Sequence, residues 1–566
     1  MSSSLIGQLR PSQVVTTFGP GSIVDLREDS VMILGLDFWP SAPDTYRVIH
    51  EPRLEASLRV KEFHIPTSGD DEPNIPCVTF PEYRSCASCE RLALVFRNAS
   101  DQTFICPNCR QEKTYPARLI MACVDGHIDD FPWSKWVHYG ASCAKGNPEL
   151  FLTSALKTAA IADLIVHCKS CKAKRSLAGS LQPLDKIQCT GRQPWLGDRI
   201  LGCKEIPRGL QRGASNVYFS LPESSISIPP WSSRLQRDID RYWATISTLL
   251  DRDPNQLRLI LPTLFPDYDL DEVSKAIIRR QGVRAASDIR EEEWLALRTI
   301  VPVAEDDFET SPEQVPDSMS AWIESLVRVT RLREVRSIRG FTRIDPPSPD
   351  SRSAAHLIDP SREHLHWRPA VEVYGEGIFF SLNRKGLETW ERSNVAMKRV
   401  NDLYEVYKEW LLDRKWPVPT NLKPRKILLH SLSHGLIRQL ALNSGYSSAS
   451  IRERIYSSDS MGGILLYTSS EDSEGSLGGL VQNGRTTVFQ NLLEDALRAA
   501  MQCSSDPLCL ENDPKETRTL NGAACHVCSL VSETSCEMAN RLLDRRLILP
   551  SDQSAESYFK DLRIQL

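Results

Sequence analysis

Two Cys-x-x-Cys pairs near the start of the chain have the spacing of a zinc-binding site. Cys86 and Cys89 form one pair, Cys106 and Cys109 form the other, and sixteen residues separate the pairs. Each Cys-x-x-Cys turn directs two thiolates to one side, and two such turns complete a tetrahedral ligand set around zinc. This is the arrangement of a zinc ribbon, and it is the strongest metal-binding signal in the sequence.

A second set of cysteines contains only one compact pair. Cys168-x-x-Cys171 would need Cys189 and Cys203, from separate loops, to complete a four-thiolate site. Between the two sets, "CVDGHIDDFPWSKWVHYGASC" contains two cysteines and two histidines at irregular spacing, namely Cys123, His127, His138 and Cys143. The sequence slightly favours a turn followed by two core tryptophans over a third site of the Cys2His2 type.

The C-terminal part carries five further cysteines, one more than a tetrahedral site needs. Cys525-x-x-Cys528 is the compact pair, and the other two ligands would come from Cys503, Cys509 and Cys536. A thioredoxin-like redox pair is disfavoured because this Cys-x-x-Cys follows an expected loop rather than a strand. Since stable disulfides are rare in a reducing compartment, zinc is the preferred interpretation here as well.

The donor sets favour a structural role for the metal. A site closed by four cysteines leaves no ligand position open for water or substrate. We therefore expect about three or four Zn²⁺ ions per chain, each of which holds short loops in place.

A histidine pair offers a different kind of site. His430 and His434 are four residues apart in "HSLSHG" and would share one face of a helix. The metalloprotease motif with this spacing has Glu directly after the first His, but Ser431 stands there. A packed histidine pair at a helix start is the preferred interpretation. A metal site completed by Glu453 or Asp459 is the second one.

Motifs for nucleotide-driven or esterase chemistry are missing from the sequence. It contains no Gly-x4-Gly-Lys-Ser/Thr P-loop and no Gly-x-Ser-x-Gly nucleophile elbow. A process driven by ATP would need its motor on another chain, and we predict no catalytic residue.

Two basic stretches are candidates for contacts with nucleic acid. "KSCKAKR" overlaps the second cysteine set, and "RVTRLREVRSIRGFTR" is expected to be a helix with Glu334 as its single acidic residue. Such side chains can bind phosphates, whereas the alternative is a solvated helix face with ion pairs to the acidic stretch "VAEDDFET". The zinc-ribbon context favours the first interpretation. The candidate contact residues are Lys169, Lys172, Lys174, Arg175, Arg328, Arg331, Arg333, Arg336, Arg339 and Arg343.

The elements between these motifs predict a mixed α+β protein of several domains. Residues 1–76 form an N-terminal segment, and residues 77–214 form a cysteine-rich region of zinc-ribbon-like β modules. Residues 215–423 carry apolar residues at three- and four-residue spacing, as in "DLDEVSKAIIRRQG", and are expected to be mainly helical with one strand pair. In residues 424–566 strand and helix patterns alternate, which predicts a C-terminal α/β zinc-binding domain.

Length and composition fit a globular protein. The chain has 566 residues, too many for one hydrophobic core, and 41% of them are hydrophobic and 25% charged. The net charge of −5 means that any surface for nucleic acid would have to be local. No apolar run approaches the roughly 20 residues that span a bilayer, and the N-terminus has no signal-peptide core. We therefore expect a cytoplasmic protein with no membrane contact.

Several longer strings resemble one protein family. They are "LRPSQVVTTFGPGSIVDL", "GLDFWP", "GHIDDFPW", "LREVRSIRGFTRI", "HSLSHGLIRQLALNSGYSSASIRERIY", "GILLYTSSEDSEGSLGGLV" and "CSSDPLC…GAACHVC…TSCEMANRLLDR". Together they are similar to the DrmB family, the helicase-associated component of the DISARM bacterial anti-phage system. The C-terminal part resembles the zinc-binding domain that occurs beside or fused to superfamily 2 helicases.

The resemblance implies partners and a role. A member of this family would pair with DrmA, a large superfamily 2 helicase, and the pair would bind DNA near single-stranded or junction regions. A DNA methyltransferase of the same system would act separately. By motif, the resemblance carries structural zinc ligands over to Cys525 and Cys528, with partners among Cys503, Cys509 and Cys536, and it supplies no catalytic residue.

Three functions compete on this basis. The preferred one is a non-motor, DNA-binding subunit of a helicase complex in phage defence. The second is a metal-dependent nuclease or hydrolase that uses His430, His434 and an acidic residue such as Glu453. The third is a scaffold that binds only protein.

Overall fold

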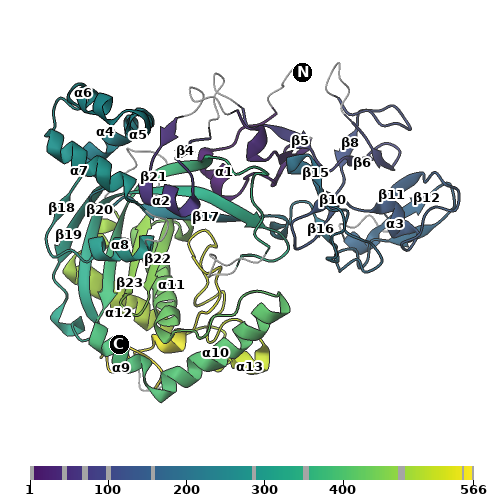
Figure 1. The fold of residues 1–566 in the computed structure, drawn as a ribbon. Coiled ribbons are helices and arrows are strands. Elements are labelled where there is room, and N and C mark those ends of the chain that lie inside the picture. The colour runs from purple at the N-terminus through teal and green to yellow at the C-terminus, as the bar shows by residue number, and fades with distance from the viewer. Residues whose placement is uncertain are drawn as a thin grey trace.

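A large mixed sheet with helices on both faces forms the body of the protein, and an arm of small sheets carries most of the cysteines (Figure 1). The computed structural model describes residues 6–27, 29–40, 47–66, 74–96, 103–154, 160–283, 288–347, 356–468, 479–550 and 554–563. Within these ranges, no helix has the length and apolar character needed to cross a membrane.

Two long antiparallel strands form the centre of the main sheet. β20 (Ile323–Thr342) and β21 (Trp367–Leu382) pair from Ile323 opposite Leu382 to Ser337 opposite Ala370. Both strands are longer than the other strands that pair with them. Two shorter strands therefore lie one after the other along the outer edge of β20, and two more lie along the outer edge of β21. The shorter strands are β17 (Phe219–Ile226) and β19 (Phe308–Glu313) beside β20, β4 (Glu62–His64) and β23 (Gly462–Thr468) beside β21, and β3 (Val48–Ile49), β18 (Val303–Ala304) and β22 (Ile451–Ser457) farther out.

Apolar residues cover both faces of this sheet. Successive residues of a strand point to opposite faces, and the neighbours Phe379 and Phe380 accordingly belong to two different buried clusters. On one face, Trp294 of α8 (Ile289–Leu297) packs edge-on against Phe379, with ring centroids 5.6 Å apart. The other face is covered by a layer of helices, which are α9 (Arg384–Glu391), α10 (Asn394–Asp413), α11 (Pro424–Ser444) and α12 (Thr486–Ala500).

The helices predicted for the middle region form a separate small cluster. α4 (Arg234–Arg241), α5 (Trp243–Arg252), α6 (Pro254–Leu264) and α7 (Leu270–Gln281) enclose a core of their own. The carboxylates of Asp253 and Asp269 cap α6 and α7, because each accepts hydrogen bonds from the first free backbone amides of its helix. The prediction of a helix in "DLDEVSKAIIRRQG" is confirmed by α7.

The prediction of an arginine-bearing helix at residues 328–343 is wrong. Residues 328–342 belong to β20, and Val329, Val335 and Ile338 are fully buried in it. β-branched side chains favour strands. All residues from Leu332 to Ile338 are buried, so both faces of the strand are covered here and the alternation of apolar and polar residues that marks a strand is missing from the sequence.

Small sheets form the N-terminal part and the arm. The N-terminal sheet contains β1 (Ile23–Asp25), β2 (Ser30–Ile33) and β5 (Cys77–Thr79). One sheet of the arm has the order β10 (Ile128–Asp130), β9 (Leu119–Ala122), β16 (Arg208–Gln211). The other has the order β13 (Lys174–Ser176), β12 (Leu164–Cys168), β11 (Leu150–Ser154), β7 (Arg91–Leu94), β6 (Tyr83–Cys86), β8 (Thr114–Pro116).

The remaining short elements connect these parts. They are α1 (Pro11–Thr16), α2 (Pro52–Leu58), α3 (Trp133–Val137), α13 (Pro514–Thr517), β14 (Arg192–Gln193) and β15 (Asp198–Arg199). Figure 1 shows β11, β12 and α3 at the far end of the arm, on the opposite side of the molecule from α9.

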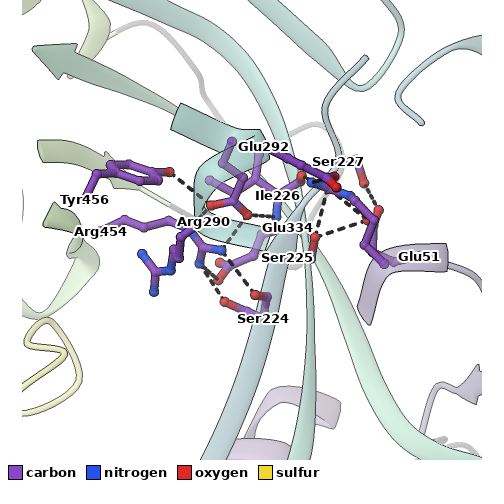
Figure 2. Close-up of polar contacts among 12 residues, drawn as sticks. Glu51, Ser224, Ser225, Ile226, Ser227, Arg290, Glu292, Glu334, Arg454 and Tyr456 are labelled. Carbon is purple, nitrogen blue, oxygen red and sulfur yellow. Dashed lines mark hydrogen bonds and ion pairs between the residues drawn. The ribbon is translucent and has the colours of Figure 1, made fainter. Parts of the chain in front are cut away.

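A buried ionic network joins α8 to three strands of the main sheet (Figure 2). Arg454 of β22 donates from Nε and Nη2 to the two oxygens of Glu293 at 2.7 and 2.6 Å, and both side chains are at most 1% exposed. The hydroxyl of Tyr456 and the amide of Ile226 donate to the same carboxylate. Burial alone would lower the pKa of Arg454, but the carboxylate of Glu293 holds it well above its ordinary value.

Substitution of Arg454 tests this network. In Arg454→Met the Glu293 carboxylate stays buried without its counter-charge, so the free energy of unfolding should fall by about 3–5 kcal/mol. The measurement is chemical denaturation followed by circular dichroism. Arg384→Met is the control, because Arg384 is 66% exposed and its pair with Glu388 is open to solvent, so its unfolding midpoint should not move. Equal midpoints for the two variants would show that the buried pair contributes nothing.

Candidate metal centres

The first predicted site is built from two similar knuckle turns. The amide of Glu90 donates to the carbonyl of Cys86 at 2.9 Å, and the amide of Arg110 donates to the carbonyl of Cys106 at 3.0 Å. Glu90 and Arg110 both have left-handed backbone, with φ of 60° and 61°, which side chains adopt only in a strongly determined turn. The turns bring four sulfurs within 4.8 Å of one another, those of Cys86, Cys89, Cys106 and Cys109.

Sulfur–sulfur distances distinguish metal ligation from a disulfide. Sγ of Cys86 lies 3.5 Å from Sγ of Cys109, and Sγ of Cys89 lies 3.7 Å from Sγ of Cys106. A disulfide bond is about 2.05 Å long, whereas four thiolates at about 2.3 Å from zinc lie about 3.8 Å apart. The distances fit a tetrahedral zinc ligand set, and all the cysteines of the chain are free of disulfides.

The second predicted set is divided between two groups. One group contains His138, Cys143, Cys168 and Cys171, and the other contains Cys123, His127, Cys189 and Cys203. The prediction that Cys168, Cys171, Cys189 and Cys203 form a single four-thiolate site is therefore wrong. The intervening Cys/His segment does not form a site of its own either, because each of its two halves completes a different group.

The group at the tip of the arm combines a knuckle with a helix end. The amide of Lys172 (φ 69°) donates to the carbonyl of Cys168 at 2.8 Å, which repeats the turn of the first site. His138 follows α3, and its Nδ1 lies 2.6 Å from the carbonyl oxygen of Ser134. Since a carbonyl only accepts, Nδ1 carries the proton, and the lone pair of Nε2 faces Sγ of Cys171 at 3.2 Å.

The neighbouring group depends on the hairpin between β9 and β10. The amide of Cys123 donates to the carbonyl of His127 at 3.0 Å, which closes the turn, and Nδ1 of His127 lies 3.3 Å from Sγ of Cys123. Gly126 is required in this turn, because its φ is +84° and a Cβ would lie 2.2 Å from Ile358. Sγ of Cys189 lies 3.6 Å from that of Cys123, and Sγ of Cys203 lies 3.9 Å from it.

The C-terminal group resolves the choice among five cysteines. The group contains Cys503, Cys509, Cys525 and Cys528, with Sγ–Sγ distances of 3.5 to 3.7 Å. The carboxylate of Asp506 stabilises the loop between the first two, since it accepts hydrogen bonds from the amides of Cys503 and Leu510 and pairs with Arg545. Cys536 lies elsewhere, beside His430.

The fifth group contains the histidine pair for which the sequence favoured packing in the core over metal binding. His430 and His434 lie with Glu453 and Cys536, and their ligand atoms are within 4.8 Å of one another. Asp459, the other acidic residue considered, is exposed and pairs with Lys423. Among the described residues, every cysteine except Cys77 belongs to one of the five groups.

The donor sets of these groups fit closed structural metal sites. Four protein ligands leave no open position for a reacting molecule. Burial raises the pKa of the Cys525 thiol, but hydrogen bonds from the amides of Cys528 and Val527 outweigh it and lower the pKa to about 6. Burial raises the pKa of the Cys509 and Cys528 thiols in the same group, so a metal that binds all four thiolates would displace protons from them.

The basic candidates differ in their accessibility. Lys169, Lys172 and Lys174 are exposed around the knuckle at the tip of the arm. Arg175 stacks on Trp136, with its guanidinium 3.6 Å from the ring centroid. On β20, four arginines pair with carboxylates: Arg328 with Glu313, Arg333 with Glu372, Arg336 with Glu334, and Arg339 with Glu223. Arg343 is fully buried on backbone carbonyls, which leaves Arg331 as the exposed member.

A double substitution tests the division of the second set. Cys171→Ala and Cys203→Ala should each remove one metal ion per chain, and the double variant should remove two, because the residues belong to separate groups. Elemental mass spectrometry on untagged protein gives the count. Cys77→Ala is the control and should keep the full complement. If the double variant loses no more metal than either single variant, the two cysteines share one site.

Comparison with known proteins agrees with this distribution of centres. Residues 10–219, which contain the three centres of the arm, match the family described as "Domain of unknown function (DUF8724)". Residues 432–529, which contain the four-cysteine centre, match the "MrfA Zn-binding domain". The chain is 34% identical over 567 residues to the "DISARM protein DrmB" of Bacillus paralicheniformis, and the similarity covers 95% of this chain and all of that protein. The chain therefore belongs to the DrmB family of the DISARM anti-phage system and contains its C-terminal zinc-binding domain.

Proposed function

We propose that the protein is a non-motor subunit of a DISARM-type defence complex that associates with a DrmA-like superfamily 2 helicase and contributes contacts to DNA. The observation that carries this proposal is the similarity to a DISARM DrmB protein from end to end, rather than in one domain. The absence of a P-loop from the sequence supports a motor on another chain. In this proposal the zinc ions hold the contact surfaces rigid and take no part in chemistry.

A surface suited to DNA lies at the tip of the arm. Lys169 and Lys172 flank the knuckle cysteine Cys171, and Lys174 follows on β13; all three lysines are exposed. No ion pair to a carboxylate involves these lysines among the described residues, so their charges are available to phosphates. The metal ligands would hold the lysines in one arrangement. This surface now replaces the arginines of β20, most of which are paired with carboxylates, as the best candidate.

A surface suited to a protein partner lies at the C-terminal centre. Leu508, between two ligand cysteines, is 84% exposed, and Val527, within the Cys-x-x-Cys pair, is 49% exposed. Apolar side chains gathered in one exposed patch mark interaction sites, and these two lie on loops that carry candidate ligands of one metal group. We assign this surface to the helicase.

Co-expression with the neighbouring helicase tests the association. The two chains should elute together in size-exclusion chromatography, and the isolated chain should not hydrolyse ATP. Leu508→Asp should weaken the complex at least tenfold, because a charge would enter an apolar contact. Leu259→Asp is the matched control, since Leu259 is 78% exposed on α6, and it should leave the complex intact. Separate elution of the wild-type chains, together with no binding to DNA at low salt, would rule out the proposed function.

Charge reversal at the tip of the arm tests the contact with DNA. The triple variant Lys169→Glu, Lys172→Glu, Lys174→Glu should weaken DNA binding by the complex and reduce the slope of log K against log salt by about two to three, since each lost phosphate contact contributes about 0.9. The matched control reverses three exposed lysines elsewhere: Lys275, Lys385 and Lys398. Equal DNA affinity and salt slope in the two triple variants would assign the lysines of the arm to plain surface.

A further inference from the structure

The group formed by His430, His434, Glu453 and Cys536 is enclosed by three separate elements. The histidines lie one turn apart on α11, Glu453 lies on β22, and Cys536 belongs to the segment that follows the four-cysteine centre. Both imidazoles are 0% exposed and Glu453 is 2% exposed. The group therefore joins the helical layer, the main sheet and the C-terminal segment in the interior of the protein.

The distances within the group are those of a tetrahedral ligand set. Nε2 of His430 lies 3.1 Å from Sγ of Cys536 and 3.5 Å from Oε1 of Glu453. Nε2 of His434 lies 3.7 Å from Oε2 of Glu453. Donor atoms about 2.0–2.3 Å from a zinc ion occupy corners that are about 3.3–3.8 Å apart. The three separations are close to that range.

His434 is held in the tautomer that a metal requires. Its Nδ1 lies 2.8 Å from the carbonyl oxygen of Ser529, which only accepts, so Nδ1 carries the proton. The lone pair of Nε2 then points into the group. Nε2 is fully buried and has no hydrogen-bond partner among the residues that the structure describes. An unpaired nitrogen in the interior is costly unless it binds something.

Glu453 and Cys536 are also oriented from outside. The amide of Glu537 donates to Oε1 of Glu453 at 2.9 Å, and the hydroxyl of Ser433 donates to Oε2. Sγ of Cys536 accepts from the amides of Asn540 at 3.2 Å and Met538 at 3.3 Å. Such outer contacts fix a carboxylate and stabilise a thiolate, as they do around protein-bound metals. Carboxylate and thiolate together carry two negative charges, which one divalent cation would neutralise.

We propose that His430, His434, Glu453 and Cys536 bind a fifth metal ion, of which zinc fits the mixed nitrogen, oxygen and sulfur donors best. The site is closed and buried, so its role is structural, and this disfavours the hydrolase interpretation of the histidine pair. It also extends beyond the matched zinc-binding domain, because His430 and Cys536 lie outside residues 432–529. Ser529 links it to the four-cysteine centre, since Ser529 directly follows the ligand Cys528.

Metal counting on the full-length, untagged protein tests this proposal. Wild-type protein should contain about five zinc ions per chain, one for each group of four ligands. Cys536→Ala and His434→Gln should each lose one ion and keep the others. Cys77→Ala and His364→Gln are the matched controls, because Cys77 belongs to no group and His364 is exposed, and they should match the wild type. A full complement in both ligand variants would overturn the proposal, because the group would then be a metal-free hydrogen-bonded cluster.

A measurement on the wild type covers the case in which these variants do not fold. After exchange of zinc for ¹¹³Cd, cadmium NMR should give five resonances. Four should lie in the region of ligand sets with three or four sulfurs, and one should be displaced far toward the region of nitrogen and oxygen donors. Sulfur-rich resonances alone would overturn the proposal. Neither measurement involves the helicase or DNA, so the result is independent of the proposed function.

Discussion

The pairing of β20 with β21 is the interaction on which the other parts of the protein depend. Residues of these two strands enter most of the buried clusters: Leu326 packs with the helical layer, Val335 with the cluster around α2, and Phe341 with the cluster at the base of the arm. Just beyond β20, the buried guanidinium of Arg343 donates to the carbonyls of Gly21, Val217 and Gly126, the last within a metal-binding turn. The end of β20 therefore helps to position the turn that carries Cys123 and His127.

Metal ligation would add to hydrophobic burial in the arm. The strands there are short, and the main buried cluster includes candidate ligand cysteines such as Cys143 and Cys168. The binding free energy of a structural zinc ion becomes folding free energy. A metal ion at the tip of the arm would therefore stabilise the knuckle turn on which the exposed Lys169 and Lys172 lie.

The sequence predicted metal ligands that lie within one turn better than it predicted which distant segments share a site. Cys-x-x-Cys pairs are visible because both ligands belong to one turn, and all four such pairs lie in groups as expected. The assignment of His138 and His127 to different groups depends on how a hairpin and a short helix point their side chains across the arm, and no spacing in the sequence encodes that. The arginines of β20 were misleading for a related reason, since partners on both faces bury residues 332–338 and the alternation that marks a strand is absent there.

Polar side chains in the interior of α11 take part both in packing of the C-terminal core and in the candidate metal group. A helix buried on all sides is ordinarily apolar, yet α11 contains "HSLSH" at its centre. Three of the four polar residues in that run have a defined hydrogen bond: Ser431 accepts from the amide of Asp544 at 2.8 Å, Ser433 donates to Glu453, and His434 donates to Ser529. Buried polar groups favour one arrangement only when all are satisfied. An ion between His434 and Glu453 would satisfy the remaining lone pair of His434, so in the proposed site the bound metal would also favour one arrangement of this core.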